Sequence, residues 1–140
     1  DYHHYHSPVE GYVRAWQKIE GTYYGVDGLA IKSDLDVLGS NARCWILLET
    51  KEFGFVLFIA IGATDVGTVQ LREEVREPGY KLEKGEEIGL FAFGGSSIIV
   101  AFENNRIQWD EDLLANTARG IETSVLVGYT LGKAIKPTAA

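Results

Sequence analysis

The sequence has a single cysteine, no methionine, three prolines and fewer basic than acidic residues. Cys44 cannot form an internal disulfide, and its place in the apolar run CWILLE predicts a buried structural thiol rather than a reactive one. Thirteen Lys and Arg against 20 Asp and Glu give a net charge of −7, which argues against a nucleic-acid partner and gives no general attraction to anionic lipid. The longest apolar run, residues 54–63, has the length of a strand and is far short of the ~20 residues of a membrane-spanning helix.

The chain is long enough for one domain with a hydrophobic core. Its 140 residues are 46% hydrophobic and 24% charged, which is usual for a globular protein. It begins at Asp1 inside a dense motif, with neither an initiator methionine nor a signal peptide. We therefore expect a processed product or a fragment of a longer precursor, in which residues 1–140 form a single domain.

Glycine and β-branched residues are frequent, and this composition favours strands over helices. The apolar runs predict strands over residues 11–19, 42–50, 55–61, 68–72, 88–93, 98–102 and 124–131. LGSN (38–41) and ENN (103–105) are predicted turns, and REEVRE (72–77) is a predicted solvated strand end of mixed charge. One short helix is predicted, with Asp110 as its N-cap and Gly120 just beyond its C-terminal end.

One local pattern suggests how some of the strands are joined. The segment EPGYKLEKGEEIGLF (77–91) places two glycines six residues apart and resembles the hairpin of lipoyl- and biotinyl-type barrel-sandwich domains. HSPVEGYV (6–13) resembles the opening strand of those domains. A lysine placed to carry lipoate or biotin is absent, so a carrier function is not expected. The predicted fold is therefore mainly β, with barrel-sandwich-hybrid character and one short helix.

All three histidines fall within DYHHYHSP (1–8), at positions 3, 4 and 6. Three interpretations compete. A metal site could use two of them, but no carboxylate or cysteine at a familiar helical spacing supports one, and we expect none. A polar or pH-sensing strand is the simplest interpretation, and acid–base catalysis is the third, because imidazole titrates near neutral pH.

The segment FGGSS (93–97) lies between two predicted strands, where an ordinary turn would be sufficient. A serine after two glycines, however, has an unhindered preceding carbonyl and a backbone that can adopt strained conformations. The Ser96 hydroxyl could therefore attack the Gly95 carbonyl and convert the amide to an ester, given a base such as histidine.

The two motifs together resemble the phosphatidylserine decarboxylase family. Its members carry an Asp-Tyr-His-x-x-His-x-Pro segment and, nearer the C-terminus, a Gly-Ser-Thr or Gly-Gly-Ser-Ser/Thr segment, which here are residues 1–8 and 94–97. GTYYGV (21–26), AIGATDVGTV (60–69) and KGEEIGLFAFGGSS (84–97) also resemble family segments, in the family's order. The chain most resembles the fungal branch, which includes decarboxylases of free aromatic amino acids such as tryptophan.

The resemblance implies a pyruvoyl cofactor that the chain makes from its own Ser96. Ser96 attacks the Gly95 carbonyl, elimination cuts the chain and leaves dehydroalanine, and hydrolysis then leaves the pyruvoyl group. Residues 1–95 would become a β chain, and residues 96–140 would become an α chain that begins with the pyruvoyl group. The pyruvoyl ketone would form a Schiff base with the substrate amine and accept the electrons released as carbon dioxide leaves.

The family motif also implies roles for the neighbouring residues. His6 matches the histidine that assists self-cleavage, and His3 matches the one implicated in decarboxylation as a proton donor. Gly94 and Ser97 complete the second motif, and we expect the Ser97 hydroxyl to form hydrogen bonds. Residues three apart on an ideal strand face opposite ways, so a single site that uses both histidines requires this segment to bend.

The chain departs from the family pattern at two points. The family usually has arginine where this chain has His4, so a fixed positive charge is absent. The family's self-cleavage triad also uses an aspartate well upstream of the first motif, and Asp1 is a different position. We therefore expect either that an upstream segment supplies this aspartate or that maturation relies on another group.

Residues outside the two motifs could contribute to a substrate site. Tyr23 and Tyr24 lie in a family-like segment and could line a pocket. Asp65 lies in the GATDVG stretch, where its carboxylate could hold the amine of a free amino acid or could simply belong to a turn. The three tryptophans are expected to pack in or beside the core rather than to line a pocket.

The substrate that the resemblance implies is phosphatidylserine, and a free L-amino acid such as tryptophan is the alternative. An alternative of another class is a non-catalytic β-barrel module that binds a ligand or metal through the histidines. The expected partners are the α and β chains of one precursor and an amine-bearing carboxylate, with no nucleic acid. Membrane contact through an upstream segment and a homo-oligomer are both compatible with the resemblance.

Overall fold

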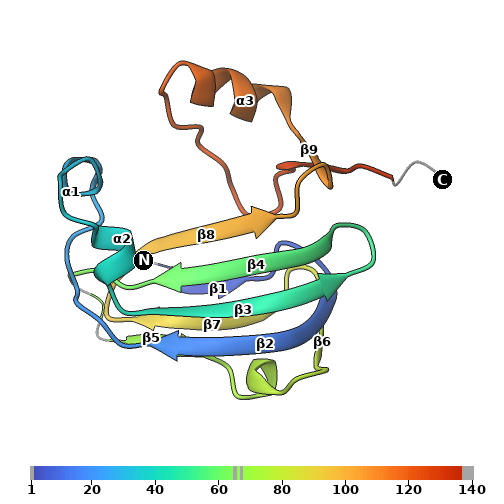
Figure 1. Ribbon diagram of the computed structural model, residues 1–140, viewed down its shortest axis with the longest axis horizontal. Helices are drawn as coiled ribbons and strands as arrows, with labels where there is room; N and C mark the ends of the chain where they lie inside the picture. Colours follow the sequence, from blue (N-terminus) through green and yellow to red (C-terminus); the bar gives the residue numbers. More distant parts are fainter. Residues whose placement is uncertain (1, 65, 67, 137–140) are drawn as a thin grey trace.

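The computed structural model describes residues 2–64, 66 and 68–136 and is built mainly of strands (Figure 1). The strands are β1 (His4–His6), β2 (Gly11–Ile19), β3 (Arg43–Thr50), β4 (Gly54–Ile61), β5 (Thr68–Leu71), β6 (Lys81–Leu82), β7 (Glu87–Ala92), β8 (Ser97–Phe102), β9 (Ile107–Trp109) and β10 (Gly132–Ala134). The helical elements are α1 (Gly28–Ile31), α2 (Val37–Ser40), the 3-10 helix η1 (Glu74–Arg76) and α3 (Glu111–Ala118). The prediction of a mainly β fold is therefore confirmed.

Two antiparallel sheets enclose the core. One has the strand order β6-β2-β3-β4-β8 and the other β1-β7-β5, while β9 and β10 form a separate ribbon. The aromatic ring of Tyr5 on β1 links the sheets: its centroid lies 5.7 Å from that of Phe58 on β4 and 4.9 Å from that of Phe91 on β7. The short strand β1, which carries two of the three histidines, is therefore anchored in the core by the residue between them.

The central strands form where the sequence alternates between core and surface positions. Along β3, Cys44, Ile46 and Leu48 are buried, while the residues between them are partly exposed. The buried thiol of Cys44 agrees with the structural role predicted for it. This alternation explains why most of the predicted strands match observed strands to within one or two residues at each end.

The predicted strand over residues 124–131 is wrong. This segment forms no strand, and Val127 and Tyr129 within it are 89% and 62% exposed. Strand β10 instead begins at Gly132, where a Cβ would lie only 2.4 Å from the carbonyl oxygen of Gln108 on β9. The close approach of the two backbones requires a glycine at this position, and the pairing with β9 starts there rather than in the β-branched residues before it.

Two further predictions of local structure are wrong. Residues 72–77 are not a solvated strand end, because they include η1, whose Val75 is completely buried. The predicted turn over residues 38–41 overlaps helix α2, where the Asp36 carboxylate accepts a hydrogen bond from the Gly39 amide at 3.0 Å. Both elements are too short to show a helical period in the sequence.

The helix predicted after Asp110 is confirmed as α3, which ends at Ala118 with Arg119 as its C-cap. The short helices α1 and α2 and the 3-10 helix η1 were not predicted. Within the part of the chain that the structure describes, no helix has the length and apolar character needed to span a membrane.

The segment over residues 77–91 does not fold back as a hairpin. Strand β6 pairs with β2 in the five-stranded sheet, whereas β7 lies between β1 and β5 in the other sheet. The turn between them passes through Gly85, whose φ of 82° lies in the left-handed region that suits glycine. This crossing brings the turn beside the end of β1.

Candidate active site

The loop that joins β7 to β8 carries the Gly-Gly-Ser-Ser motif. Phe93 has φ 68° and is 87% exposed, and Gly94 has φ 148°, so both lie in the region that L side chains rarely adopt. Strand β7 therefore ends at Ala92, one residue before the end of the predicted strand 88–93. Because β8 begins at Ser97, Ser96 is the last residue of the loop.

The hydroxyl of Ser96 is buried and lacks a hydrogen-bond partner among the described residues. A buried polar atom without a partner costs about 1–3 kcal/mol, so most of these atoms are paired in folded proteins. The Nε of Arg106 is a second such exception, and Ser96 differs from it in its place in the motif. The neighbouring Ser97 belongs to the sheet, where it pairs with Ile61 of β4.

His3 lies against the peptide that precedes Ser96. A Cβ at Gly95 would be 3.2 Å from Cδ2 and 3.4 Å from Nε2 of the His3 ring. The backbone of His3 is fixed in turn by its carbonyl, which accepts a hydrogen bond from the Phe91 amide at 2.9 Å. The imidazole and the candidate cleavage site are therefore neighbours, although about 90 positions separate them in the sequence.

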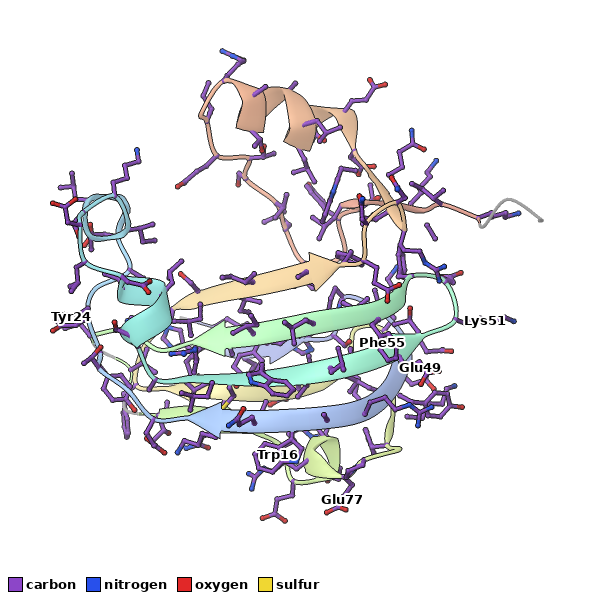
Figure 2. All side chains as sticks on the ribbon, viewed as in Figure 1. Trp16, Tyr24, Glu49, Lys51, Phe55 and Glu77 are labelled. Atoms are coloured by element: carbon purple, nitrogen blue, oxygen red, sulfur yellow. The ribbon has the colours of Figure 1, made fainter. Side chains whose placement is uncertain are left out.

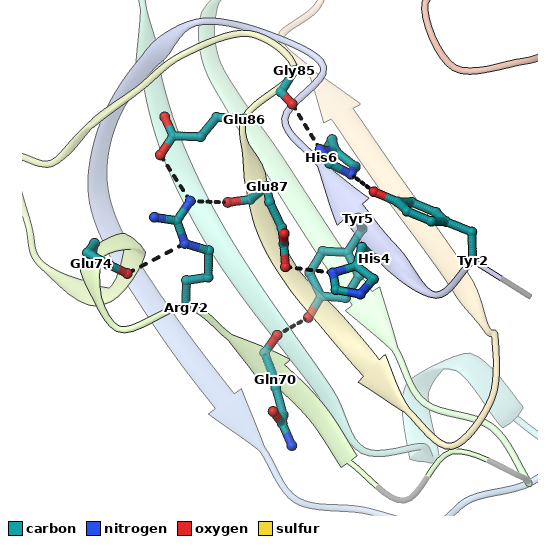
Figure 3. Close-up of polar contacts among 10 residues, drawn as sticks. All are labelled: Tyr2, His4, Tyr5, His6, Gln70, Arg72, Glu74, Gly85, Glu86 and Glu87. Carbon is teal, nitrogen blue, oxygen red and sulfur yellow. Dashed lines mark hydrogen bonds and ion pairs between the residues drawn. The ribbon is translucent and has the colours of Figure 1, made fainter.

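His6 has different surroundings (Figure 3). Its Nδ1 lies 2.9 Å from the Gly85 carbonyl oxygen, which can only accept, so Nδ1 carries the proton when the ring is neutral. Its Nε2 is then the acceptor for the Tyr2 hydroxyl, and the Tyr2 ring stacks on His6 with centroids 5.7 Å apart. No hydrogen bond joins His6 to Ser96 within the described residues.

His3 and His6 face opposite ways because side chains alternate along β1 and the residues just before it. Tyr2, His4 and His6 share one face, where the ring of Tyr2 contacts both imidazoles. Tyr5 points into the core, and its hydroxyl donates to the Gln70 carbonyl at 2.5 Å; burial raises the pKa of this phenol. The register of β1 against β7 shifts between Tyr5 and His6, but this irregularity does not bring His6 to Gly95.

Charged side chains hold the turn that contacts His6. Arg72 reaches Oε1 of Glu86 at 3.2 Å and the carbonyl of Glu87 at 3.0 Å (Figure 3). Burial alone would raise the pKa of the Glu86 carboxyl, but hydrogen bonds from Tyr80 and the Glu83 amide, with the charge of Arg72, lower it. The sequence did not reveal the contact of His6 with Gly85, because a backbone carbonyl has no signature in a motif.

The other predicted site residues lie at the same end of the molecule or outside the described residues. The ring of Tyr23 lies against Gly62, where a Cβ would be 3.1 Å from Cε1 of the tyrosine. Tyr24, labelled in Figure 2, is 44% exposed. Its backbone amide and carbonyl form hydrogen bonds with the side chain of Asn41. Asp65 and Asp1 lie outside the described residues.

Two hollows on the surface are lined by other residues than the predicted site residues. One, of about 250 Å³, is formed by residues of the α1–α2 connection and α2. The other, of about 290 Å³, is lined by residues that include Trp16, Cys44 and Arg76. Within residues 2–64, 66 and 68–136, no three His, Cys, Asp or Glu side chains form a group that could hold a metal ion.

Comparison with known proteins shows the family of the chain. The family model described as phosphatidylserine decarboxylase matches residues 1–133. The chain belongs to the phosphatidylserine decarboxylase family. It is 48% identical over 132 residues to phosphatidylserine decarboxylase proenzyme 2 of Komagataella phaffii, a match that covers 94% of this chain and 13% of that protein.

Other members of the phosphatidylserine decarboxylase family are similar over nearly the whole chain. Identity is 44% over 137 residues with proenzyme 3 of Schizosaccharomyces pombe, covering 98% of this chain and 14% of that protein. It is 42% over 133 residues with the proenzyme of Chlamydia muridarum, covering 95% of this chain and 43% of that protein. The chain thus spans less than half the length of these relatives, and their names do not favour the amino acid or binding-module alternatives.

Proposed function

We propose that this chain is the catalytic part of a pyruvoyl-dependent phosphatidylserine decarboxylase that cleaves itself between Gly95 and Ser96. The observation that carries the proposal is the buried Ser96 hydroxyl, which has no partner among the described residues, at the motif serine of a chain in this family. The names of the relatives, which describe those proteins as proenzymes, are consistent with a precursor that is processed.

Self-cleavage requires that Ser96 become a nucleophile. Its oxygen attacks the carbonyl carbon of Gly95, and the peptide bond is replaced by an ester while the nitrogen of Ser96 becomes an amine. Removal of the α-proton of Ser96 then breaks the bond between its Cβ and oxygen. This elimination releases the Gly95 carboxylate, and water hydrolyses the remaining dehydroalanine with loss of ammonia.

The proposed roles of the histidines follow the family motif. His6 is assigned to self-cleavage, and its Nε2 is the nitrogen that can accept a proton, because Nδ1 faces the Gly85 carbonyl. The Tyr2 hydroxyl pairs with that nitrogen, so it has to be displaced or to relay the proton. His3, beside Gly95, is assigned to proton return at the α-carbon during decarboxylation.

The surroundings of Ser96 fit a cofactor made in place. The pyruvoyl group supplies an electron sink for the electrons left behind when carbon dioxide departs. Tyr23, against Gly62, is a candidate wall of the substrate pocket, and Gly94 and Ser97 flank the Gly95–Ser96 pair. Tyr24 and Asp65 are also candidate pocket residues. Tyr24 lies in the family-like segment 21–26 with Tyr23, and Asp65 lies in the family-like segment 60–69 with Gly62.

The proposed products are a β chain of residues 1–95 and an α chain of residues 96–140. The break falls between β7 and β8, which belong to different sheets. The α chain would stay attached through β8, which pairs with β4 from Val56–Phe102 to Ile61–Ser97. The two chains are therefore each other's first partners.

Phosphatidylserine is the proposed substrate because the relatives named above are phosphatidylserine decarboxylases. The test is carbon dioxide release by the full-length processed protein from phosphatidylserine vesicles and, separately, from free L-tryptophan. We expect release from the vesicles alone. Release from tryptophan alone would contradict the lipid assignment but leave the pyruvoyl chemistry intact.

The test of the cofactor is the denatured mass of the full-length protein with and without borohydride. We expect two chains that separate at Gly95–Ser96, the smaller of which gains mass when its ketone is reduced. Ser96→Ala should give a single chain with no decarboxylation. Ser124→Ala changes an exposed serine that also lies within residues 96–140, and this variant should be processed normally. Normal decarboxylation by the Ser96→Ala variant would overturn the proposal.

A further inference from the structure

Asn41 is a polar residue buried at the end of the molecule that carries the Gly95–Ser96 loop, and it is 0% exposed. Its Oδ1 accepts hydrogen bonds from the Thr22 hydroxyl at 3.0 Å and the Tyr24 amide at 2.9 Å. Its Nδ2 donates to the carbonyls of Tyr24 and Gly62, each at 2.9 Å. A primary amide has two acceptor positions and two donor hydrogens, so the side chain is fully satisfied.

These four hydrogen bonds, which we term the Asn41 clamp, join three segments of the chain. The segments are residues 22–24, the C-cap of α2 just before β3, and the residue that follows β4. Backbone hydrogen bonds follow the same path, from the Ala42 amide to the Thr22 carbonyl at 2.8 Å and from the Gly62 amide to the Ala42 carbonyl at 2.7 Å. The clamp therefore fixes the end of β4 from the side opposite β8.

The clamped end of β4 supports Ser96. Ile61 pairs with Ser97, so Ser96 and Gly62 each lie one residue beyond the last pair of the β4–β8 ladder. Ser96 has no side-chain hydrogen bond of its own within the described residues, and Phe93 in the same loop is almost fully exposed. The β4–β8 ladder, which ends one residue before Ser96, therefore sets the position of this residue together with the packing of His3 against Gly95.

We propose that Asn41 is a positioning residue for self-cleavage at Gly95–Ser96, an inference that rests on the proposed function. A buried and fully satisfied polar network holds a single arrangement, because every alternative leaves an unpaired group. Loss of the clamp frees the end of β4 and the Tyr23 ring packed on it. A displacement of about 1 Å at the reacting atoms can slow a reaction about 100-fold.

The experiment measures how fast newly synthesised full-length precursor separates into two chains, together with its melting temperature. Asn41→Ala is compared with Thr50→Ala, which removes a buried polar side chain at the other end of β3. The Thr50 hydroxyl donates to the Gly54 carbonyl and accepts from the Phe53 amide, each at 2.9 Å. Figure 2 shows the two ends of this strand, marked by Tyr24 and Lys51.

We expect Asn41→Ala to slow cleavage about 10- to 100-fold, while Thr50→Ala lowers the melting temperature and cleaves at the wild-type rate. Equal rates in the two variants would overturn the positioning role but leave the proposed function standing. A wild-type precursor that stays intact would overturn the proposed function itself, and with it the role of Asn41.

A milder variant covers the case in which Asn41→Ala does not fold. Thr22→Val removes one of the four hydrogen bonds of the clamp and keeps the shape of the side chain. We expect cleavage slower than in the wild type but faster than in Asn41→Asp, which loses both donors of the clamp. Wild-type cleavage in both of these variants would contradict the inference.

Discussion

At the scale of single residues, the alternation of side chains along β1 decides what each histidine can reach. Tyr5 points into the core between the sheets, which fixes the direction of its neighbours. His3 lies beside Gly95, and His6 lies between Gly85 and Tyr2. The motif names both histidines, but only the folded chain separates their surroundings.

This separation predicts that substitution of His6 and substitution of His3 abolish different steps. His6→Ala should leave the full-length precursor uncleaved, because the proposed base is missing. His3→Ala should cleave normally and lose decarboxylation about 100- to 10,000-fold, the usual contribution of a general acid. Denaturing mass measures cleavage, and carbon dioxide release measures turnover.

His4→Ala is the matched control for this pair. His4 lies on the exposed side of β1, pairs with Glu87 at 2.8 Å and contacts the ring of Tyr2, but it has no proposed chemical role of its own. Both cleavage and turnover should therefore be retained. An uncleaved His3→Ala precursor would contradict the assignment of His3 to decarboxylation alone.

A second prediction at this scale concerns Cys44. Burial raises the pKa of its thiol from the ordinary value of 9.0 to about 11. Because the folded state keeps the proton more tightly than the unfolded state, this thiol contributes stability below pH 9 that is lost as the pH rises through 11. The loss should appear in the difference between the unfolding free energies of the wild type and Cys44→Ala, measured in urea at several pH values. A difference that stays constant from pH 8 to pH 11 would contradict it.

At the scale of elements, the sequence pattern gave a wrong prediction where a segment is buried against a distant part of the chain. The mixed charges of residues 72–77 are typical of a solvated segment, yet η1 packs against β2 and completely buries Val75. The period of a three-residue helix cannot be read from a sequence. Val75 is therefore visible as a core residue only in the folded chain.

Truncation of Val75 should consequently be costly. We expect Val75→Ala to lower the free energy of unfolding by about 2 kcal/mol, the transfer and cavity cost of two buried carbon atoms. Glu73→Ala, at an exposed neighbour, should change it by less than about 0.5 kcal/mol. Urea unfolding of both variants tests this, and equal effects would show that η1 does not close the core.

At the scale of the whole molecule, the proposed cleavage point lies where two sheets meet. Strand β7 remains paired with β1 and β5, and β8 remains paired with β4. Neither sheet loses a strand when the connecting loop is cut. The fold can therefore survive the reaction that would convert the precursor into two chains.

This arrangement predicts that the cleaved chains stay together. The chains of residues 1–95 and 96–140 should elute as one species from a native size-exclusion column, at equal amounts, and separate in denaturant. The pairing of β8 along its whole length with β4 is the physical reason. An α chain that elutes alone without denaturant would show that this pairing is too weak to hold it.

The sequence alone determined the family, the β class and most strands, because these depend on local order and alternation. Buried and partly exposed residues alternate along β3, and the two motifs are continuous stretches, so both are visible without any contact being known. The helix after Asp110 was equally visible, since its N-cap and its following glycine are local signals.

Only the tertiary structure decided which groups meet. The contact of His6 with Gly85 spans 79 positions, and the Asn41 clamp joins segments 17 to 21 positions apart. Asn41 itself looked like a turn residue, because a polar side chain before a strand is usually solvated. Such contacts follow from the pairing of strands across the two sheets, and a strand's own residues do not specify its distant neighbours.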